Sequence, residues 1–313
     1  MTKRERVLAA VARQPVDRPP VAFWRHVPDV DHTAEGLAVA MLDFHRRWDL
    51  DLIKVMSSGV YCVEDWGCTV AYRGSPNGAK QCTEHAVKTR GDWARIRSLD
   101  PGAGALGREL DAIRRIRKGR TDDAPILHTA FSPLTIARKL AGGERLREDM
   151  ASALAAVQAA LEAGADGIFF ATQAATPEVL TAEEHARWDL PYARRVLDAV
   201  PGSAFTMLHV HGTDIYFDAV AELPGHAINW HERLTAPSLA DARRRRRHGA
   251  LVGGLGEGST LRRGPVAAIA EQVRDAVRQA AGVGVIVGPG CVLPLDVPDA
   301  HLAAVGDTVA TLR

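Results

Sequence analysis

Two histidines one residue apart end an apolar run that is typical of a buried strand. The run 203–211 carries His209 and His211, and Gly212 follows directly. Side chains two residues apart on a strand point to the same face, so both imidazoles would face one point in space. Imidazole nitrogen and thiolate sulfur are preferred zinc ligands, and three protein ligands with an open fourth position form a catalytic site. Together with Cys291, which follows the last apolar run, the pair predicts such a zinc site.

Each of these residues also has a simpler interpretation. A His-x-His pair at a strand end is more often a hydrogen-bonded pair of partly buried imidazoles, and a single cysteine is more often a small buried hydrophobe. The joint placement of the three residues at strand ends favours the metal. Residues that follow other apolar runs could supply a fourth ligand or orient the first three, namely His231, Glu232 and Glu257.

Polar residues near further strand ends are candidates for binding a small-molecule substrate. Arg25 and Lys54 are cations, which would anchor an anionic substrate. The complete set of candidates consists of Arg25, His26, Lys54, Tyr61 and Gln173.

These residues need elements that bring strand ends together. Eight short apolar runs alternate with segments of helical period, and they span residues 20–24, 51–56, 125–131, 166–172, 203–211, 226–232, 250–256 and 283–290. Alternating strands and helices predict a parallel sheet, and eight such units predict closure into a (β/α)8 (TIM) barrel with its active site at the carboxyl ends of the strands. A doubly wound open sheet is the alternative fold, because the number of strands does not prove closure.

The segments between the runs predict the rest of the barrel. Residues 148–165 and 264–282 have helical periodicity, and the amino terminus predicts a helical extension. Residues 57–124, after the second strand, are too many for one crossover. They predict an inserted loop or small hairpin that overhangs one end of the barrel, followed by a helix over 104–119. All of 1–313 is expected to form one domain.

Composition excludes several classes of protein. The net charge of +1 argues against a nucleic-acid-binding protein, and the basic run 243–247 is expected to face water on a helix. The amino terminus lacks the apolar region of a signal peptide, and no run is long enough to span a membrane. Four cysteines are too few and too irregular for a disulfide framework, so a cytoplasmic protein is expected. The glycine-rich stretch 253–260 lacks the spacing of a nucleotide-binding motif, and a flexible loop is expected there.

Motifs along nearly the whole chain resemble the uroporphyrinogen decarboxylase superfamily, which includes zinc-dependent methylcobamide:coenzyme M methyltransferases. The matching segments are "KRERVLAAVARQPVDRPPV", "FSPLTIARKLAG", "EAGADGIFF", "LHVHG" and "VGPGCVLPLDVPDAHLAAV". The resemblance implies a (β/α)8 barrel with its site at the carboxyl ends of the strands.

The methyltransferase branch implies a zinc site on particular residues. Its zinc is held by an H-x-C-G motif and by the cysteine of a later "PGC" turn. The matching residues are His209, Gly212 and Cys291, while His211 replaces the first cysteine. In that branch zinc binds and deprotonates an acceptor thiol, which takes a methyl group from methylcobamide on a partner protein. One thiolate and two imidazoles leave a charge of about +1, which makes the zinc a stronger Lewis acid and a bound thiolate a poorer nucleophile.

The decarboxylase branch is matched less well. Arg25 matches the first arginine of its signature, but Asp29 stands in place of the second, and Lys139 stands where a tyrosine is expected. A metal-free lyase that uses Arg25, Lys54 and Lys139 on a carboxylate-rich substrate is one alternative function, and a non-catalytic binding barrel is another. A corrinoid-binding motif is lacking, since "DAHLAA" from Asp299 has no glycine, so a corrinoid would have to come on another protein.

Overall fold

A parallel sheet forms the centre of the molecule and carries the strand ends at which the chemistry was predicted. The computed structural model describes residues 1–142 and 159–312. In this part of the chain seven strands follow one another in the order of the sequence, and each neighbouring pair is parallel. They are β1 (Ile53–Lys54), β4 (Ile126–Phe131), β5 (Gly167–Thr172), β6 (Phe205–Val210), β7 (Ala227–Trp230), β8 (Ala250–Leu255) and β9 (Val285–Pro289).

The sheet curls so that its first and last strands approach each other through the segment 20–22. Val21 forms an isolated parallel bridge with Val287 of β9. The Ala22 amide donates to the Val287 carbonyl (3.0 Å), and the Asp51 amide, just before β1, donates to the Val21 carbonyl (2.9 Å). The sheet is therefore a TIM-like barrel. A doubly wound sheet, whose strand order reverses, is ruled out by the sequential order of these strands.

The expected first strand, 20–24, is longer than the pairing that the structure forms there. Only one bridge forms there, at Val21. Pro19 and Pro20 precede this position, and proline has no backbone N–H to donate to a neighbouring strand. Residues beyond Ala22 leave the sheet, which places Trp24 to His26 at the mouth of the barrel rather than within a regular strand.

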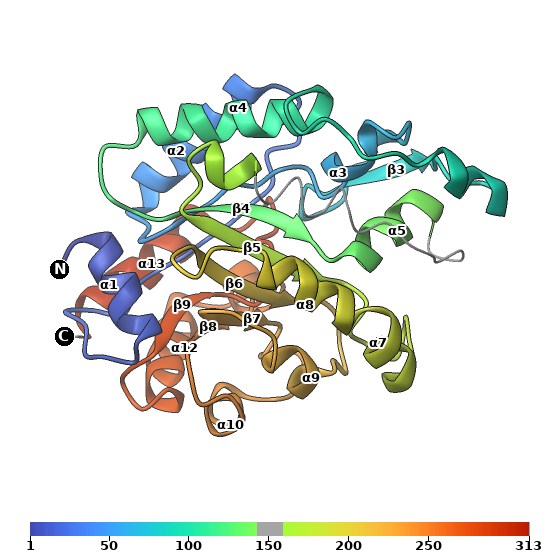
Figure 1. The fold of residues 1–313 in the computed structure, drawn as a ribbon. Coiled ribbons are helices and arrows are strands. Elements are labelled where there is room, and N and C mark those ends of the chain that lie inside the picture. Colours follow the sequence, from blue (N-terminus) through green and yellow to red (C-terminus); the bar gives the residue numbers. More distant parts are fainter. Residues whose placement is uncertain (143–158, 313) are drawn as a thin grey trace.

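Helices surround the curled sheet (Figure 1). The expected helix over 104–119 is confirmed as α4, and most of the segment 264–282, which has helical periodicity, forms α12. The predicted helix 148–165 lies largely outside the described residues. The helices are α1 (Lys3–Val11), α2 (Ala34–Trp48), α3 (Tyr61–Glu64), the 3-10 helix η1 (Arg90–Arg95), α4 (Gly104–Gly119), α5 (Pro133–Ala141), α7 (Ala182–Trp188), α8 (Leu190–Asp198), α9 (Phe217–Ala221), α10 (Leu239–Arg245), α11 (Thr260–Arg263), α12 (Val266–Gln279) and α13 (Asp299–Ala310).

The insertion after β1 contains the expected small hairpin. β2 (Thr69–Tyr72) and β3 (Lys80–Glu84) pair antiparallel, and they project on the side of the molecule away from both termini (Figure 1). The turn between them contacts the loop after β9, because the Leu295 amide donates to the Pro76 carbonyl (2.8 Å). Lys80 forms an ion pair with the buried Asp31. The hairpin thus overhangs the carboxyl ends of the strands.

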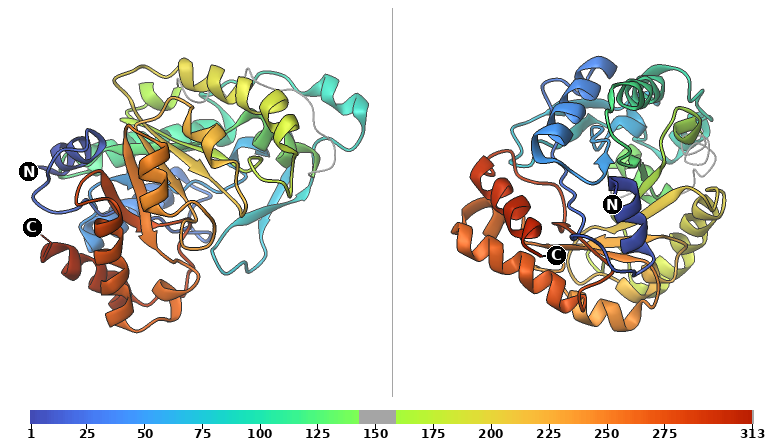
Figure 2. Two further views of the ribbon diagram at one scale, coloured as in Figure 1. Left: turned by 90° about the horizontal axis from the view of Figure 1, so that it is seen from below. Right: turned by 90° about the vertical axis from the view of Figure 1, so that its left-hand side faces the viewer.

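The opposite end of the barrel is covered by α1, which lies across it when the molecule is seen from that side (Figure 2, right). Arg6 of this helix donates to Asp51 (2.6 Å), whose side chain is fully buried. Arg13, just after the helix, donates to the carbonyls of Gly249 (2.9 Å) and Arg246 (2.6 Å). These bonds tie the amino-terminal extension to the floor of the barrel.

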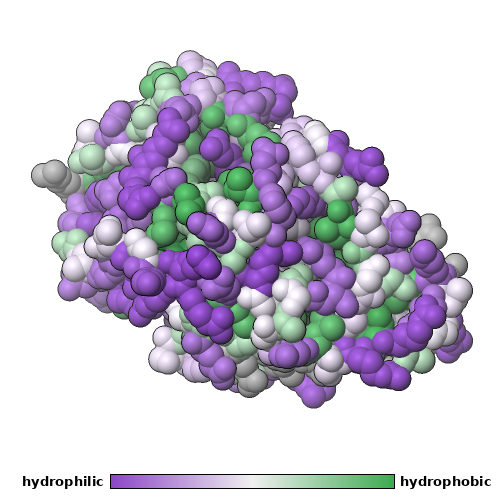
Figure 3. All heavy atoms as spheres, turned by 90° about the horizontal axis from the view of Figure 1, so that it is seen from above, coloured by the Kyte–Doolittle hydropathy of each residue, from purple (hydrophilic) through white to green (hydrophobic). Residues whose placement is uncertain are grey.

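On the face over α4, hydrophilic residues predominate and apolar residues form small scattered groups (Figure 3). Arg244 and Arg245 of the basic run are exposed, as expected. Arg246 is not, because it is buried and donates to the carbonyls of Ala221 and Gly225, so the expectation of a wholly water-facing run was wrong. No helix in the described ranges is long and apolar enough to cross a membrane.

Candidate metal centre

Three predicted ligands meet at the mouth of the barrel. His209 lies at the end of β6, His211 follows that strand, and Cys291 follows β9 on the other side of the ring. One donor atom from each lies within 4.8 Å of the other two. Cys291 Sγ is 3.7 Å from His209 Nε2 and 3.6 Å from His211 Nδ1. With Zn–S of about 2.3 Å and Zn–N of about 2.0–2.1 Å, a tetrahedral site has S···N separations of about 3.5–3.6 Å, so the spacing fits zinc.

Two glycines allow the chain to present these ligands. Gly212 has a φ of 108°, a conformation that favours glycine, and turns the chain directly after His211. A side chain at Gly290 would come within 2.8 Å of the His231 backbone, so only glycine permits Cys291 to approach this close.

Asn229 of β7 decides which nitrogen of His209 faces the other ligands. Its Nδ2 donates to the carbonyls of Val252 (2.9 Å) and Pro289 (3.0 Å), which leaves Oδ1 toward His209. His209 Nδ1 lies 2.6 Å from this oxygen and must donate its proton to it. The lone pair is then on Nε2, the nitrogen that faces Cys291. Burial lowers the pKa of His209, which favours the neutral, metal-binding ring.

His231 adjoins the three ligands and is itself held by Glu257. Its Nδ1 donates to Glu257 Oε1 (2.8 Å), and Glu257 Oε2 accepts the Gly290 amide (3.1 Å). His231 Nε2 lies 3.4 Å from His211 Nδ1. Burial opposes a charge on His231, but the hydrogen bonds with Cys291 and Glu257 prevail and raise its pKa to about 10.

Cys291 is favoured as a thiolate, the form that binds metals. Burial raises the pKa of its thiol, but the neighbouring imidazoles, His209 first, lower that pKa well below its usual value.

Glu232, another predicted donor, points elsewhere. Its Oε1 accepts the Gly254 amide (2.8 Å), and Arg233 lies 3.4 Å away. Burial raises the pKa of Glu232 to about 7. Its one hydrogen bond with the backbone of β8 directs this carboxylate away from the three ligands, and Oε2 has no partner in the described part of the chain.

A buried lysine lies beside the cluster. Lys54 Nζ is 4.3 Å from the centre of the Phe169 ring, and that ring stacks on His209 with centroids 5.1 Å apart. The Nζ atom donates to Met56 Sδ (2.9 Å), and no carboxylate of the described residues forms an ion pair with it. Burial lowers the pKa of Lys54 to about 7, although Cys291 acts in the opposite direction.

Two further predicted substrate residues are buried near Lys54. His26 Nδ1 has no hydrogen-bond partner in the described part of the chain, and burial followed by the charge of Lys54 lowers the pKa of His26 to about 3. Tyr61 donates to the Thr129 carbonyl (2.7 Å) and lies 3.0 Å from His128 Nε2. His26 thus retains a free polar atom, whereas the hydroxyl of Tyr61 is already engaged.

Arg25 and Gln173 are not brought to the cluster by their described contacts. The Arg25 guanidinium lies 5.3 Å above the ring of Phe44 in α2, and Asp299 of α13 is its main charged neighbour. The backbone of Gln173 instead fixes α5, since its amide donates to Thr135 Oγ1 (3.0 Å).

Sequence reasoning missed Asn229 and Phe169, which hold and line the cluster. Asn229 is directly opposite His209 in the sheet register, and it is fully buried in an apolar run. A single amide side chain in an apolar run could have marked Asn229 as a residue that bonds a neighbouring strand, because buried polar groups need hydrogen-bond partners.

The comparisons with known proteins agree with the fold. A family model described as Uroporphyrinogen decarboxylase (URO-D) matches residues 2–312. Among curated proteins, Methylcobamide:CoM methyltransferase MtbA of Methanosarcina acetivorans is 23% identical over 96% of this chain and 95% of its own length. MtbA of Methanosarcina mazei is 25% identical with the same coverage. The uroporphyrinogen decarboxylase of Citrobacter koseri is 26% identical over 99% of this chain and 97% of its own length.

Solved structures show the same architecture. A methyltransferase from Methanosarcina mazei superposes with a TM-score of 0.84 at 22% identity and covers 99% of this chain and 98% of its own. A B12-independent methionine synthase from Shewanella sp. W3-18-1 gives a TM-score of 0.59 at 12% identity and covers 96% of both chains. At these identities the likeness establishes the fold.

Proposed function

The chain belongs to the uroporphyrinogen decarboxylase family, and from that premise we propose that it is a zinc-dependent methyltransferase. It would move a methyl group from a corrinoid on a separate protein to a thiol or similar acceptor. One observation carries this proposal, namely the convergence of His209, His211 and Cys291 with the donor spacing of tetrahedral zinc. The similarity of the chain to methylcobamide:CoM methyltransferases along its full length supports the same reaction class.

Several residues of the chain would have distinct roles in such a site. His209, His211 and Cys291 would hold the ion, which supplies a Lewis acid that lowers the pKa of a bound thiol. Asn229 keeps the lone pair of His209 on Nε2. Glu257 orients His231 at the edge of the cluster, where the raised pKa of His231 favours an imidazolium that can donate a hydrogen bond toward the ligands or the acceptor.

Lys54 supports an acceptor that carries a negative charge. It is a buried cation without a carboxylate partner among the described residues, and its ammonium contacts the Phe169 ring, which also stacks on His209. An acid group at this position would relieve the cost of burying the ammonium and would aim the rest of the molecule toward the three ligands. We therefore propose Lys54 as the anchor for the acceptor.

The metal-free lyase is a second candidate, favoured by the buried Lys54 together with the half-buried Lys139. Lys139 resembles Lys54 in lying over an aromatic ring, that of Phe131 at 4.8 Å, and burial lowers the pKa of both. Arg25, the third cation that this reaction would use, lies against α2 instead. Because Arg25 does not lie with the two lysines, the lyase is the weaker candidate.

Elemental analysis of the purified full-length protein tests the metal. We expect His209→Ala and Cys291→Ser to lower the zinc content by about one equivalent relative to the wild-type protein. His248→Ala is the matched control, because His248 is exposed and precedes β8 at the other end of the barrel. Unchanged zinc content in both variants would remove the basis of the proposal.

Methyl transfer itself is measured with methylcobalamin and a panel of thiols, with and without an acid group. Formation of the methyl thioether, lost in Cys291→Ser, is the expected result. Loss of transfer for the acidic thiols alone in Lys54→Met would support the anchor. Turnover of a carboxylate-rich substrate with release of carbon dioxide in the zinc-free protein would favour the lyase, and a chain that binds ligands but catalyses neither reaction would be a binding barrel.

A further inference from the structure

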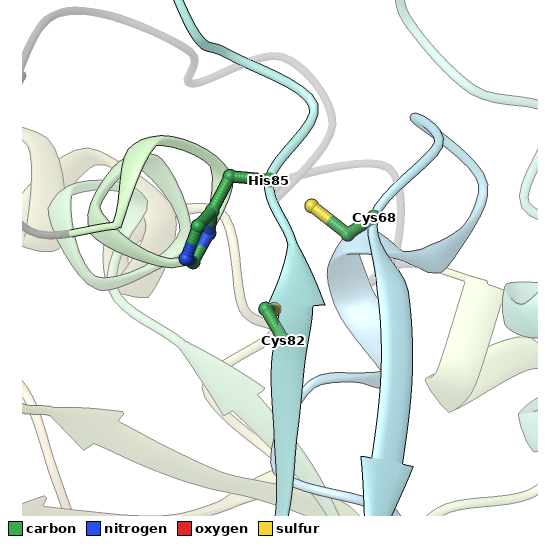
Figure 4. A group of neighbouring side chains, drawn as sticks. All are labelled: Cys68, Cys82 and His85. Atoms are coloured by element: carbon green, nitrogen blue, oxygen red, sulfur yellow. The ribbon is translucent and has the colours of Figure 1, made fainter.

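A second group of sulfur and imidazole ligands lies in the inserted hairpin. Cys68 precedes β2, Cys82 lies within β3, and His85 follows β3. One donor atom from each of the three residues lies within 4.8 Å of the other two. Figure 4 shows the two cysteines on neighbouring strands and His85 above them on the same chain segment as Cys82. The group shares no residue with the candidate metal centre.

A β-bulge brings these side chains together. Val70 pairs with Cys82 and Thr69 pairs with Glu84, so Thr83 is an extra residue on β3. Residues 82 and 85 would face opposite sides of a regular strand, but an extra residue reverses the alternation. The position opposite His85 is then that of Cys68. The bulge thus places three metal-binding side chains on one side of the hairpin.

Backbone groups hold two of these side chains in place. The Ala86 amide donates to Cys68 Sγ (3.4 Å), and an N–H donor of this kind favours a thiolate. His85 Nδ1 donates to the Lys139 carbonyl at the end of α5 (2.9 Å). Metal-binding histidines are commonly fixed by such a bond to a carbonyl.

The hairpin has little core of its own, although Cys68 is buried in the main core and Val70 and Cys82 pack against that core. None of the residues of β2 or β3 is fully buried. A two-stranded hairpin without a hydrophobic face is marginally stable in water. Its turn nevertheless reaches the barrel mouth, where Gly78 lies against His26 and Leu295. A link at the base of the hairpin would hold the turn in that position.

We propose that Cys68, Cys82 and His85 bind a second zinc ion, separate from the candidate metal centre, which fixes the base of the hairpin. Two thiolates and one neutral imidazole balance the charge of Zn2+, which favours a stable site. Cys82 and His85 are only half-buried, so the ion can reach them and a water molecule can complete its coordination. This inference does not depend on the proposed methyl transfer.

The Cys291→Ser variant isolates this site, because the candidate metal centre then contains no thiolate. We expect the full-length Cys291→Ser protein, stripped of zinc and titrated with Co2+, to develop thiolate-to-cobalt absorption in the near ultraviolet. Adding Cys82→Ser should reduce this absorption by about half or more, and adding Cys68→Ser as well should abolish it. His85→Ala, which keeps both sulfurs, should weaken Co2+ binding about 10-fold or more.

Cys62→Ala in the same background is the matched control, because its buried thiol lies in α3 and is not part of the group. It should retain the absorption. Absence of thiolate-to-cobalt absorption from the folded Cys291→Ser protein would refute the second site. Equal loss of absorption in Cys62→Ala would also refute it, as would a Cys68–Cys82 disulfide found in place of metal by the intact mass of freshly purified, unreduced protein.

Discussion

At the scale of single residues, the candidate metal centre depends on side chains that hold the ligands as well as on the ligands. Asn229 bonds two backbone carbonyls and the ring of His209 at once. The ring can therefore neither rotate nor exchange its tautomer without losing a buried hydrogen bond, which would cost about 1–3 kcal/mol. Asn229 is a positioning residue in this sense.

Replacement of Asn229 is expected to weaken metal binding. Asn229→Ala removes the acceptor for His209 Nδ1–H, and loss of such a partner typically lowers metal affinity 10- to 100-fold. Competition with a chromophoric chelator measures the affinity. The double variant with His209→Ala should show no additional loss, because the amide acts through this ring. Wild-type affinity in Asn229→Ala would contradict the role.

His211→Cys tests the consequence of the unusual ligand. A second thiolate would cancel the remaining charge of the site, so the pKa of a bound thiol should rise. The number of protons released on thiol binding is measured as a function of pH. The midpoint of this curve should lie at higher pH than in the wild-type protein. Zinc content should remain at the wild-type value. A midpoint that moves to lower pH would contradict this electrostatic account.

Lys54 should make stability depend on pH. Burial lowers its pKa from the ordinary value of 10.5 to about 7, so between these values the unfolded chain binds more protons than the folded one, and stability rises with pH. Below pH 7 the folded protein holds a buried charge at full cost. Lys54→Met should therefore be more stable than wild type at pH 6, with a difference that shrinks toward pH 10. Urea unfolding at several pH values measures this, and a difference independent of pH would contradict it.

The convergence of His209, His211 and Cys291 could be predicted from sequence, because their order along the chain already places them at strand ends. His209 and His211 share a face, and Cys291 follows the last run. The residues that escaped prediction act across strands. Asn229 meets His209 only through the register of β6 and β7. Arg25 was predicted to bind substrate, but it lies over Phe44 because the chain leaves the sheet after Ala22. Such contacts depend on how the strands pair and on the direction in which the chain leaves the sheet. The local sequence pattern specifies neither.

At the scale of elements, helices and buried strands were predictable from periodicity, whereas the hairpin ligands were not. Cys68, Cys82 and His85 have irregular spacing, and only the bulge at Thr83 brings them together. The segment 20–24 was overestimated because its apolar composition resembles a strand, while its prolines limit the pairing.

The contact between β9 and the segment 20–22 should tolerate no added bulk. A side chain at Gly288 would come within 2.7 Å of the Ala22 carbonyl, whereas nothing lies within 4 Å of one at Gly202. Gly288→Ala should lower the free energy of unfolding by about 1–3 kcal/mol, the usual cost of overpacking. Gly202→Ala should change it little. Equal stabilities of the two variants in urea would contradict the close approach.

At the scale of the whole molecule, closure of the barrel depends on residues far apart in the sequence. Asp51 accepts from Arg6 (2.6 Å), from Arg18 (2.7 Å) and from the Val21 amide (2.7 Å), so one carboxylate joins α1, the segment 18–21 and the start of β1. The apolar runs 20–24 and 51–56 contain Val21 and Asp51, but they predicted only a parallel sheet and not the bonds from Arg6 and Arg18 that complete this link. The prediction of a closed barrel therefore rested on the family resemblance and on the number of apolar runs, not on any local pattern.

Removal of the Asp51 carboxylate should destabilise the entire fold. Asp51→Ala leaves the buried guanidinium of Arg6 with only Asp17 as its acid partner, and breaking a buried pair costs about 3–5 kcal/mol. Asp43→Ala is the control, because its pair with Arg46 is exposed and worth roughly 0.5 kcal/mol or less. Chemical denaturation compares the two, and similar losses would contradict the role of Asp51.

The covered floor of the barrel also has a kinetic consequence. α1 and Arg13 close the amino-terminal end, so both reactants of the proposed transfer must enter through the mouth beneath the hairpin. A corrinoid protein docked on that mouth would block the passage of a small acceptor. We therefore expect compulsory-order kinetics, with the acceptor bound first and its product released last. Competition between the product and the acceptor, but not between the product and the methyl donor, would be the signature of this order.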